Sequence, residues 1–447
     1  MRLLYILLSA TITLVSHAQN VLTPEMLIGL NRVSPGLFSP TGEHILYSIS
    51  NVDYKSEKTN TDLFLFTIAT GQAKQLTKTV EGEFNPVWIS NSEVAFLSAP
   101  SGQLQMSVVN TSGVIRKIEG NVANINECTF DARNNLVVAL QSVKVKETLN
   151  DKYPDLPNAN ARLEEDLMYR HWNAYDDYTV QKLYVHTFDG KKIGTGKLLS
   201  IDDYPAATPS FGGMDQISLN PTNEQIVFST KKLKGTAFAT STNTELYAIN
   251  NGVEEHLTLG WNLNGYDMHP QYSAQGKLAW MNMERAGFEA DKVNIFLYES
   301  AQGYRNLTEK FYYSIDDFKW NGDGSRIYFL ATIEATKQIF VLDVKSLRIT
   351  QLTTGDHDYT SIAVSGDKIV ATRNTMIQPA DLYLIDYSQN KAGKVFTSIA
   401  RVTKVNPEWE KLDLPTVEKH WVTTSDQKKM LVWMVIPPNA IKEKENP

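Results

Sequence analysis

Cysteine is almost absent from this sequence of 447 residues, in which Cys128 is the only one. A single cysteine cannot form an internal disulfide, so the packed core has to hold the fold together. Cys128 stands in the strand-like stretch NECTFDARNNLVVAL. This context favours a small buried side chain over a reactive nucleophile.

Sustained basic runs and metal motifs are also missing. The formal net charge is -7, and no patch of Lys and Arg indicates nucleic acid or an anionic membrane as a partner. The sequence contains no H-E-x-x-H, and GTGKLL at 194–199 lacks the spacing of a phosphate loop. NGDGS at 321–325 is too short for a calcium loop. We therefore expect no cofactor and no metal.

The chain has a long apolar run only at its N-terminus. Arg2 precedes an apolar stretch from Leu3 to Val15, and Ser16-His17-Ala18 follows it. This pattern predicts a secretory signal at 1–18 that is cleaved after Ala18. A membrane anchor is the alternative, but the run is shorter than the roughly 20 residues of a span. The mature protein is expected to be secreted or periplasmic and free of the membrane.

One strand pattern recurs along most of the chain. FKWNGDGSRIYFLATIEATKQIFVLDVKSLRITQLT, at 318–353, predicts four strands joined by turns rich in Gly, Asn and Asp. Similar units begin near 36, 86, 128, 217, 270 and 362, and several end in Leu-Thr. A repeat of about 40–50 residues with four strands each is typical of a β-propeller, in which each sheet buries its faces on its neighbours. We predict an all-β fold with seven blades between 36 and 400; a pair of β-sandwiches is the alternative.

Two segments depart from this repeat. Residues 144–180 interrupt the third unit, and we expect a helix from Arg162 to about His171 within this insertion. A long insertion in a compact repeat is usually functional, although it can also be a surface loop. The tail at 413–447 contains a predicted hairpin whose second strand is apolar on both faces, as in a strand inside a larger sheet. The predicted organisation is a signal at 1–18, a propeller at 19–412 and the start of another domain at 413–447.

Several motifs, in this order, resemble the prolyl oligopeptidase family of serine peptidases, most closely its dipeptidyl peptidase V and acylaminoacyl peptidase branch. They are LTPEMLIGLNRVSPGLFSPTGEHILY, LEEDLMYRHWNAY, AWMNMERAGFEADKVNIFLYE and VEKHWVTTSDQKKMLVWMVIPP. The resemblance implies a propeller followed by an α/β-hydrolase domain whose serine stands on a G-x-S-x-G elbow. That elbow is absent from the 447 residues. We therefore expect the tail to be the first strands of a truncated hydrolase. We also expect this chain to contain no catalytic residue and to hydrolyse no peptide by itself.

The resemblance also implies that acidic propeller side chains hold the free α-amine of a short peptide. An ammonium group is held best by ionised carboxylates in a partly desolvated cleft. The insertion offers the densest acidic cluster beside aromatic residues, although acids at a solvated helix N-terminus would look the same. The predicted substrate-binding residues are Glu164, Glu165, Asp166, Tyr169, His171 and Trp172, with Tyr175 beside them. A second acidic group, Glu284, Glu289 and Asp291, could instead be a set of loop ion pairs with Arg285.

We therefore predict the substrate-gating propeller of a secreted serine exopeptidase that removes dipeptides or acylated residues from short peptides. A homodimer through a hydrolase domain absent from these residues is left open. The main alternative is a non-catalytic periplasmic propeller that binds partners in an envelope complex. A propeller enzyme of the sugar-processing or lyase type is less favoured, because no His and Asp constellation repeats across the blades.

Overall fold

The computed structural model describes residues 20–120, 123–131, 133–159, 161–200, 202–207, 212–389, 395–438 and 440. The predicted signal at 1–18 lies outside the described residues. Within them, no helix combines the length and apolar character needed to cross a bilayer. The chain divides into a larger unit, 31–405, and a smaller unit formed by 1–30 and 406–447.

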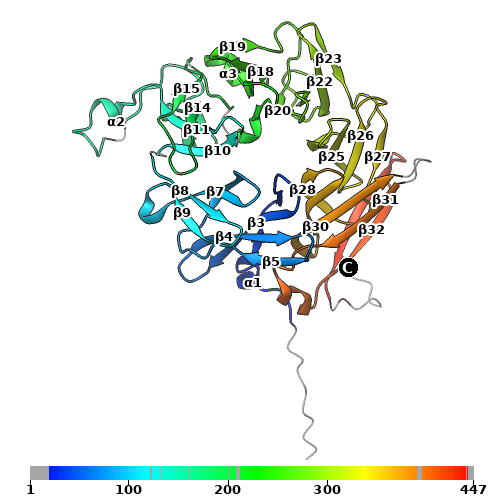
Figure 1. Cartoon of the computed structure of the whole chain (residues 1–447). Coiled ribbons are helices and arrows are strands. Elements are labelled where there is room, and N and C mark those ends of the chain that lie inside the picture. The colour runs from blue at the N-terminus through cyan, green and yellow to red at the C-terminus, as the bar shows by residue number, and fades with distance from the viewer. Residues whose placement is uncertain are drawn as a thin grey trace, which may run out of the picture. The chain divides into compact units, whose positions relative to one another are not determined.

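Among its described residues, the larger unit contains seven antiparallel sheets of four or five strands that follow one another along the chain, and one two-stranded sheet within the insertion (Figure 1). In the first sheet, the short strands β1 and β2 both pair with β3. The first three sheets are β1 Arg32–Val33, β2 Leu37–Phe38, β3 His44–Asp53, β4 Lys58–Thr67 and β5 Gln72–Gln75; β6 Phe84–Trp88, β7 Glu93–Ser98, β8 Gln105–Asn110 and β9 Ile115–Lys117; and β10 Ile125–Asp131, β11 Leu136–Lys144, β14 Thr179–Thr187 and β15 Lys197–Leu198.

The remaining four sheets follow the same order along the chain. They are β16 Ile217–Leu219, β17 Ile226–Thr230, β18 Glu245–Asn250 and β19 Val253–His256; β20 Asp267–Tyr272, β21 Leu278–Asn282, β22 Asn294–Ser300 and β23 Gly303–Asn306; β24 Ile315–Trp320, β25 Arg326–Ile333, β26 Thr336–Asp343 and β27 Ile349–Gln351; and β28 Asp358–Ser365, β29 Lys368–Thr375, β30 Gln378–Gln389 and β31 Val395–Arg401. The all-β fold with seven blades is confirmed, and we number the blades 1 to 7 in chain order.

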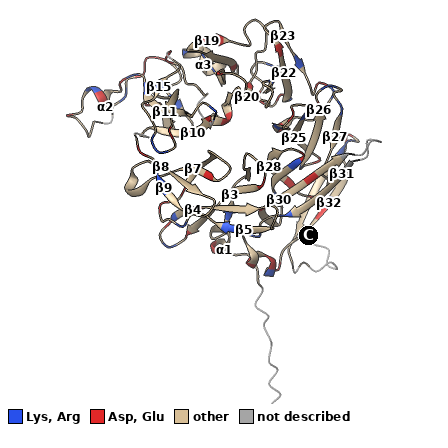
Figure 2. Ribbon diagram, viewed as in Figure 1, with Lys and Arg blue, Asp and Glu red and all other residues tan. Residues whose placement is uncertain are grey.

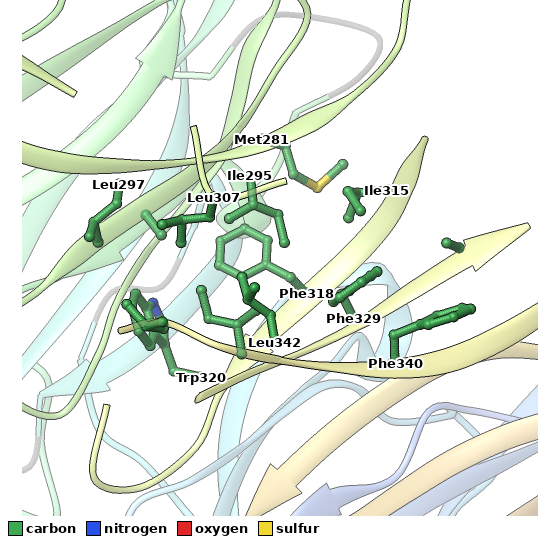
Figure 3. Packing of buried hydrophobic residues seen from close by; sticks show 14 of the residues in the cluster. Met281, Ile295, Leu297, Leu307, Ile315, Phe318, Trp320, Phe329, Phe340 and Leu342 are labelled. Carbon is green, nitrogen blue, oxygen red and sulfur yellow. The ribbon is translucent and has the colours of Figure 1, made fainter. Parts of the chain in front are cut away.

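Seven apolar clusters close the blades into a ring. One cluster lies between each pair of successive blades, and another joins blade 1 to blade 7 through Ile45, Tyr47, Val370 and Leu382. Figure 3 shows the cluster between blades 5 and 6, where Phe318, with no exposed surface, packs among residues of both blades. Each blade therefore buries both faces on its neighbours, which replaces the disulfides that the sequence cannot form.

Strand β11 shows how one sequence serves two interfaces. Val137 and Ala139 pack in the cluster shared with blade 2, whereas Val138 and Leu140 pack in the cluster shared with blade 4. Successive side chains of a strand point to opposite faces, so a strand between two neighbours has to be apolar at every position. This explains the unbroken run LVVAL in the sequence.

The Leu-Thr blade endings have a structural role. The side-chain oxygens of Thr77, Thr258, Thr308 and Thr353 each accept a hydrogen bond from a backbone N–H of their blade's third strand, at 2.8–3.2 Å. The preceding leucine donates its own N–H to the same strand in each blade. These bonds satisfy buried backbone groups where the fourth strand hands over to the next blade.

The described part of the smaller unit contains α1 Pro24–Ile28, the 3₁₀ helix η3 Pro407–Lys411 and one hairpin. The hairpin pairs β32 Thr416–Thr423 with β33 Lys429–Ile436, and Trp421 lies opposite Leu431. Asp413 donates its backbone N–H to the carbonyl of Asn20 at 2.9 Å, which joins the two stretches of this unit. The assignment of the hairpin to a hydrolase domain stays a prediction.

Candidate functional site

One face of the ring carries the long loops. In an antiparallel four-stranded blade, the connection between strands 2 and 3 emerges where strand 1 begins and strand 4 ends. The insertion between β11 and β14, the loop 231–244 and the loop 283–293 are all connections of this kind. They therefore lie on the same face as the two ends of the larger unit, Asn31 and Val405.

The loops of blades 3, 4 and 5 touch one another along this face. Asp166 of the insertion lies against Gly235 at the start of α3 Gly235–Thr240, where a Cβ would come within 2.6 Å of its carboxylate. Gly235 has a φ of +58°, so a side chain there would also be strained. Gly287 of blade 5 donates its N–H to the Thr242 hydroxyl of blade 4 at 2.8 Å. The three loops thus form one continuous rim.

The prediction of a helix at 162–171 is wrong. The insertion instead contains the short helix α2 Leu149–Lys152, whose N-terminus is stabilised by a capping box of Thr148 and Asp151. It also contains a hairpin formed by β12 Arg170–His171 and β13 Ala174–Tyr175. Figure 1 shows α2 out beyond the strands of its blade, and Figure 2 shows that it carries charges of both signs. The stretch 161–169 has no regular secondary structure, because its acidic side chains bind separate parts of the blade and its rim.

The three predicted acids do not converge on one point. Glu165 forms an ion pair with Lys146 at 3.0 Å, and this hydrogen bond lowers the pKa of the Glu165 carboxyl. Glu164 accepts a hydrogen bond from the Tyr178 hydroxyl at 2.8 Å, while the Lys146 ammonium lies 4.8 Å from the centre of the Tyr178 ring. Asp166 faces Gly235 instead. Asp166 Oδ1 also accepts the backbone N–H of Leu167 at 2.8 Å, so all three acids already have protein partners.

The predicted aromatic residues lie mostly in solvent. The Trp172 residue is 71% exposed, and His171 packs edge-on against it at 4.8 Å between ring centres. Tyr169 and Tyr175 are exposed as well, and the Arg162 guanidinium lies 4.4 Å from the centre of the Tyr175 ring. These side chains form an open aromatic surface on the insertion rather than the walls of a closed pocket.

In the second acidic group, Asp291 and Glu289 have different partners. Arg285 binds the Asp291 carboxylate through its Nε at 2.8 Å and its Nη2 at 2.7 Å, so the predicted loop ion pair is confirmed for these two residues. The Arg285 hydrogen bond lowers the pKa of the Asp291 carboxyl. Glu289 takes a different place and accepts a hydrogen bond from the Tyr266 hydroxyl at 3.2 Å.

A pocket of about 330 Å³ opens between blades 4 and 5 beside Glu289. Its walls come from the stretches before β16 and β18, the end of β17, the start of β20 with the residue before it, and the loop 283–293. The lining residues are Gly212, Gln216, Ser229, Thr244, Tyr266, Met268, His269, Met283 and Glu289. Met283 and Glu289 belong to the motif AWMNMERAGFEADKVNIFLYE, but the other lining residues come from two repeats and from no motif, so the sequence does not reveal the pocket.

Five histidines of the larger unit and Cys128 belong to the blades and their connections. His44, His186, His256 and His269 lie in blade strands and His357 in a blade connection, and the described residues contain no group of three metal-binding side chains. Cys128 is buried, and burial raises the pKa of its thiol to about 12. Cys128 is therefore a structural residue.

Comparison with known proteins shows that the chain is similar in sequence to a dipeptidyl peptidase. It is 32% identical over 433 residues to dipeptidyl-peptidase 5 of Porphyromonas gingivalis, a match that covers 95% of this chain and 62% of that protein. No family model matches the chain. The chain thus spans less than two thirds of the length of this curated relative.

Two solved structures share the fold. Acylaminoacyl peptidase of Pyrococcus horikoshii superposes with a TM-score of 0.68 at 14% identity, over 93% of this chain and 59% of that one. The β-propeller domain of the trilobed protease of Pyrococcus furiosus, described as having an open velcro topology, superposes with a TM-score of 0.55 at 12% identity, over 84% of this chain and 97% of that domain. At such identities these structures support the fold alone.

Proposed function

We propose that the chain is the propeller part of a serine exopeptidase like those of the dipeptidyl peptidase V and acylaminoacyl peptidase branch of the prolyl oligopeptidase family. In this proposal the enzyme removes dipeptides or acylated residues from short peptides. The observation that carries the proposal is the 32% identity to a dipeptidyl-peptidase 5 over 95% of the chain. The seven-bladed fold is compatible with it, because acylaminoacyl peptidase shares this fold over 93% of the chain. The alternative of an envelope-complex binding protein is not favoured, since the relatives are peptidases.

In this proposal the ring restricts access to short peptides, and the loop-bearing face binds their N-terminus. A free α-amine carries a positive charge and three donors at neutral pH, so carboxylates bind it through charge-assisted hydrogen bonds. The proposed contacts are those of the insertion: Glu164, Glu165 and Asp166 for the amine, and Tyr169, His171 and Trp172 for the adjoining peptide. Secretion, directed by residues 1–18, is part of the same proposal.

The proposal is tested by calorimetric titration of the chain with a dipeptide amide and with its N-acetylated form. Binding of the free amine alone is expected, since acetylation removes the charge that the carboxylates recognise. Replacing Glu164, Glu165 and Asp166 together by their amides should weaken binding about tenfold or more, the loss expected for a charge-assisted hydrogen bond worth about 1.5–3 kcal/mol.

The matched control is Glu43→Gln, which removes an exposed acid from the turn between strands 1 and 2 of blade 1, on the opposite face of the ring. Its affinity should equal that of the unmodified chain. Equal affinity for the free and acetylated peptides would refute recognition of the N-terminus by this propeller.

A further inference from the structure

The pocket between blades 4 and 5 has walls whose polar groups are already satisfied. The hydroxyls of Ser229 and Thr244 both donate to the backbone carbonyl of Asp267, the latter at 2.7 Å. Gln216 accepts from the backbone N–H of His269 at 3.2 Å and donates to Asp215 at 3.0 Å. A ligand therefore meets a wall that behaves as apolar, with the side chains of Met268 and Met283 in it.

Glu289 is the one carboxylate among the described lining residues of this pocket. It has no ion pair within 4 Å among the described residues, unlike Glu165 and Asp291. Its hydrogen-bond donor is Tyr266, whose hydroxyl stays neutral because burial, and then the charge of Glu289, raises the pKa of the phenol. The tyrosine holds the carboxylate in place without neutralising its charge.

The neighbouring cations do not occupy this carboxylate. Lys231 lies close enough for Glu289 to influence it, yet its ammonium donates to the carbonyl of Ser241 and lies 4.4 Å from the centre of the Phe238 ring. Burial lowers the pKa of His269, so the imidazole in the wall is neutral at pH 7. The negative charge at the pocket therefore remains available to a ligand.

The loop that carries Glu289 is fixed at both of its sides. Arg285 and Asp291 clamp its base through their ion pair, and the Arg285 guanidinium lies 4.2 Å from the centre of the Phe288 ring. The bond from Gly287 to Thr242 ties the tip of the loop to blade 4. Holding a charged group in position before binding reduces the entropy that a ligand has to offset.

We propose that this pocket binds a primary ammonium group attached to a small apolar body, with Glu289 on the ammonium and the methionine-lined wall on the apolar part. A volume of about 330 Å³ lies at the small end of ligand pockets, which fits a single amino-acid residue. Two sources share this chemistry: the N-terminal residue of a peptide and the side chain of a lysine. The first source rests on the proposed function, and it makes Glu289, in place of the insertion acids, the residue that holds the α-amine.

The test is calorimetric titration of the whole chain at pH 7 with four probes: leucinamide, N-acetyl-leucinamide, glycinamide and N-acetyl-lysinamide. Leucinamide should bind and its acetylated form should not, because acetylation removes the charge. Glycinamide should bind at least about tenfold more weakly, since burying a leucine side chain is worth roughly 1.5–3 kcal/mol. Binding of N-acetyl-lysinamide instead of leucinamide would support the pocket chemistry and assign it to lysine side chains.

Two variants and one control locate the site. Glu289→Gln should weaken leucinamide binding by about tenfold to a hundredfold, and Met283→Lys, which places a like charge in the wall, should abolish it. The matched control is Glu284→Gln, which removes the same charge from the same loop outside the lining residues and should leave the affinity unchanged. Circular dichroism confirms that each variant is folded.

The outcomes separate this inference from the proposed function. If Glu289→Gln binds as tightly as the unmodified chain while the insertion variants lose affinity for free amines, the inference is overturned and N-terminal recognition stands. If neither set of variants changes the affinity and acetylated probes bind equally well, both are overturned. Loss of binding in Glu289→Gln alone supports the pocket as the site of the ammonium.

Discussion

Replacing Asp267 by asparagine should change how the stability of the propeller depends on pH. The Asp267 side chain has no exposed surface and accepts hydrogen bonds from Trp280 Nε1 at 2.6 Å and Asn282 Nδ2 at 2.7 Å. Its other oxygen, Oδ2, has no hydrogen-bond partner among the described residues. Burial raises the pKa of this carboxyl to about 7, and the two hydrogen bonds only partly oppose that shift. The folded protein therefore keeps a proton there that an ordinary aspartate would lose.

The size of the effect follows from the two pKa values. An aspartate in an unfolded chain titrates near pH 3.9, so between about pH 4 and 7 the folded state binds more protons than the unfolded state. The free energy of unfolding falls as the pH rises through this window, by up to about 1.4 kcal/mol per pH unit. The contribution is complete below pH 4, and on the order of 3 kcal/mol of it is lost between pH 5 and pH 8.

The assay is urea unfolding at pH 5, 6, 7 and 8, followed by the fluorescence of tryptophans such as Trp280. Asp267→Asn keeps the shape of the side chain and removes the titration, so the stability of this variant relative to the unmodified protein should rise by on the order of 3 kcal/mol from pH 5 to pH 8. The control is Asp386→Asn, an exposed aspartate on β30. A difference between the Asp267 variant and the unmodified protein that stays constant over this range would refute the reasoning.

Three further outcomes are expected. Thr308→Val should cost about 1–3 kcal/mol in urea unfolding because it leaves a buried backbone N–H unpaired, whereas Thr70→Val on an exposed turn should cost little; equal losses would count against the blade-ending role. Cys128 should not react with a thiol reagent until urea unfolds the protein, since burial raises its pKa to about 12, and rapid native labelling would contradict this. Met434→Lys together with Val435→Lys should reduce self-association in sedimentation velocity, because both side chains are exposed on opposite faces of the hairpin; an unchanged distribution would show that these faces do not drive it.

The ring could be predicted from the sequence because its physical requirement repeats with the blade. Every blade needs apolar strands that face two neighbours, turns with positive φ between them, and a group that satisfies the backbone at its end. The run LVVAL in β11 meets the requirement for apolar faces on both sides, and the recurring Leu-Thr pairs meet the requirement for backbone hydrogen bonds at the blade end. Both patterns can be recognised within a single repeat. The burial of Cys128 follows from the same pattern, since it stands within a strand at a blade interface.

The insertion could not be predicted in the same way, because it belongs to no repeat. The run LEEDLMYRHW has the composition of a helix, but helix propensity is weak over so short a stretch and tertiary contacts override it. Here Glu164 and Glu165 bind Tyr178 and Lys146 of the same insertion, and Asp166 reaches the next blade. None of these partners lies at a helical spacing from the acid that it holds.

Whether an acid can bind a ligand depends on what the protein has already placed beside it. The sequence contains two acidic groups, one in the insertion and one at 284–291, and it favours the insertion group, which is the denser one and has aromatic neighbours. In the folded chain, Lys146 binds Glu165 and Arg285 binds Asp291. Glu164 and Glu289 each accept a hydrogen bond from a tyrosine hydroxyl, but Glu289 alone of these four acids lines the pocket. An ammonium that binds Glu165 has to displace a lysine, whereas one that binds Glu289 replaces water at a fixed carboxylate beside an apolar wall.

The energy of the displaced ion pair does not by itself separate the two sites. A surface ion pair is worth at most about 1 kcal/mol, so the need to displace Lys146 still allows an ammonium to bind Glu165. The desolvated wall therefore decides in favour of Glu289, because it adds apolar burial that the open surface around Trp172 does not provide.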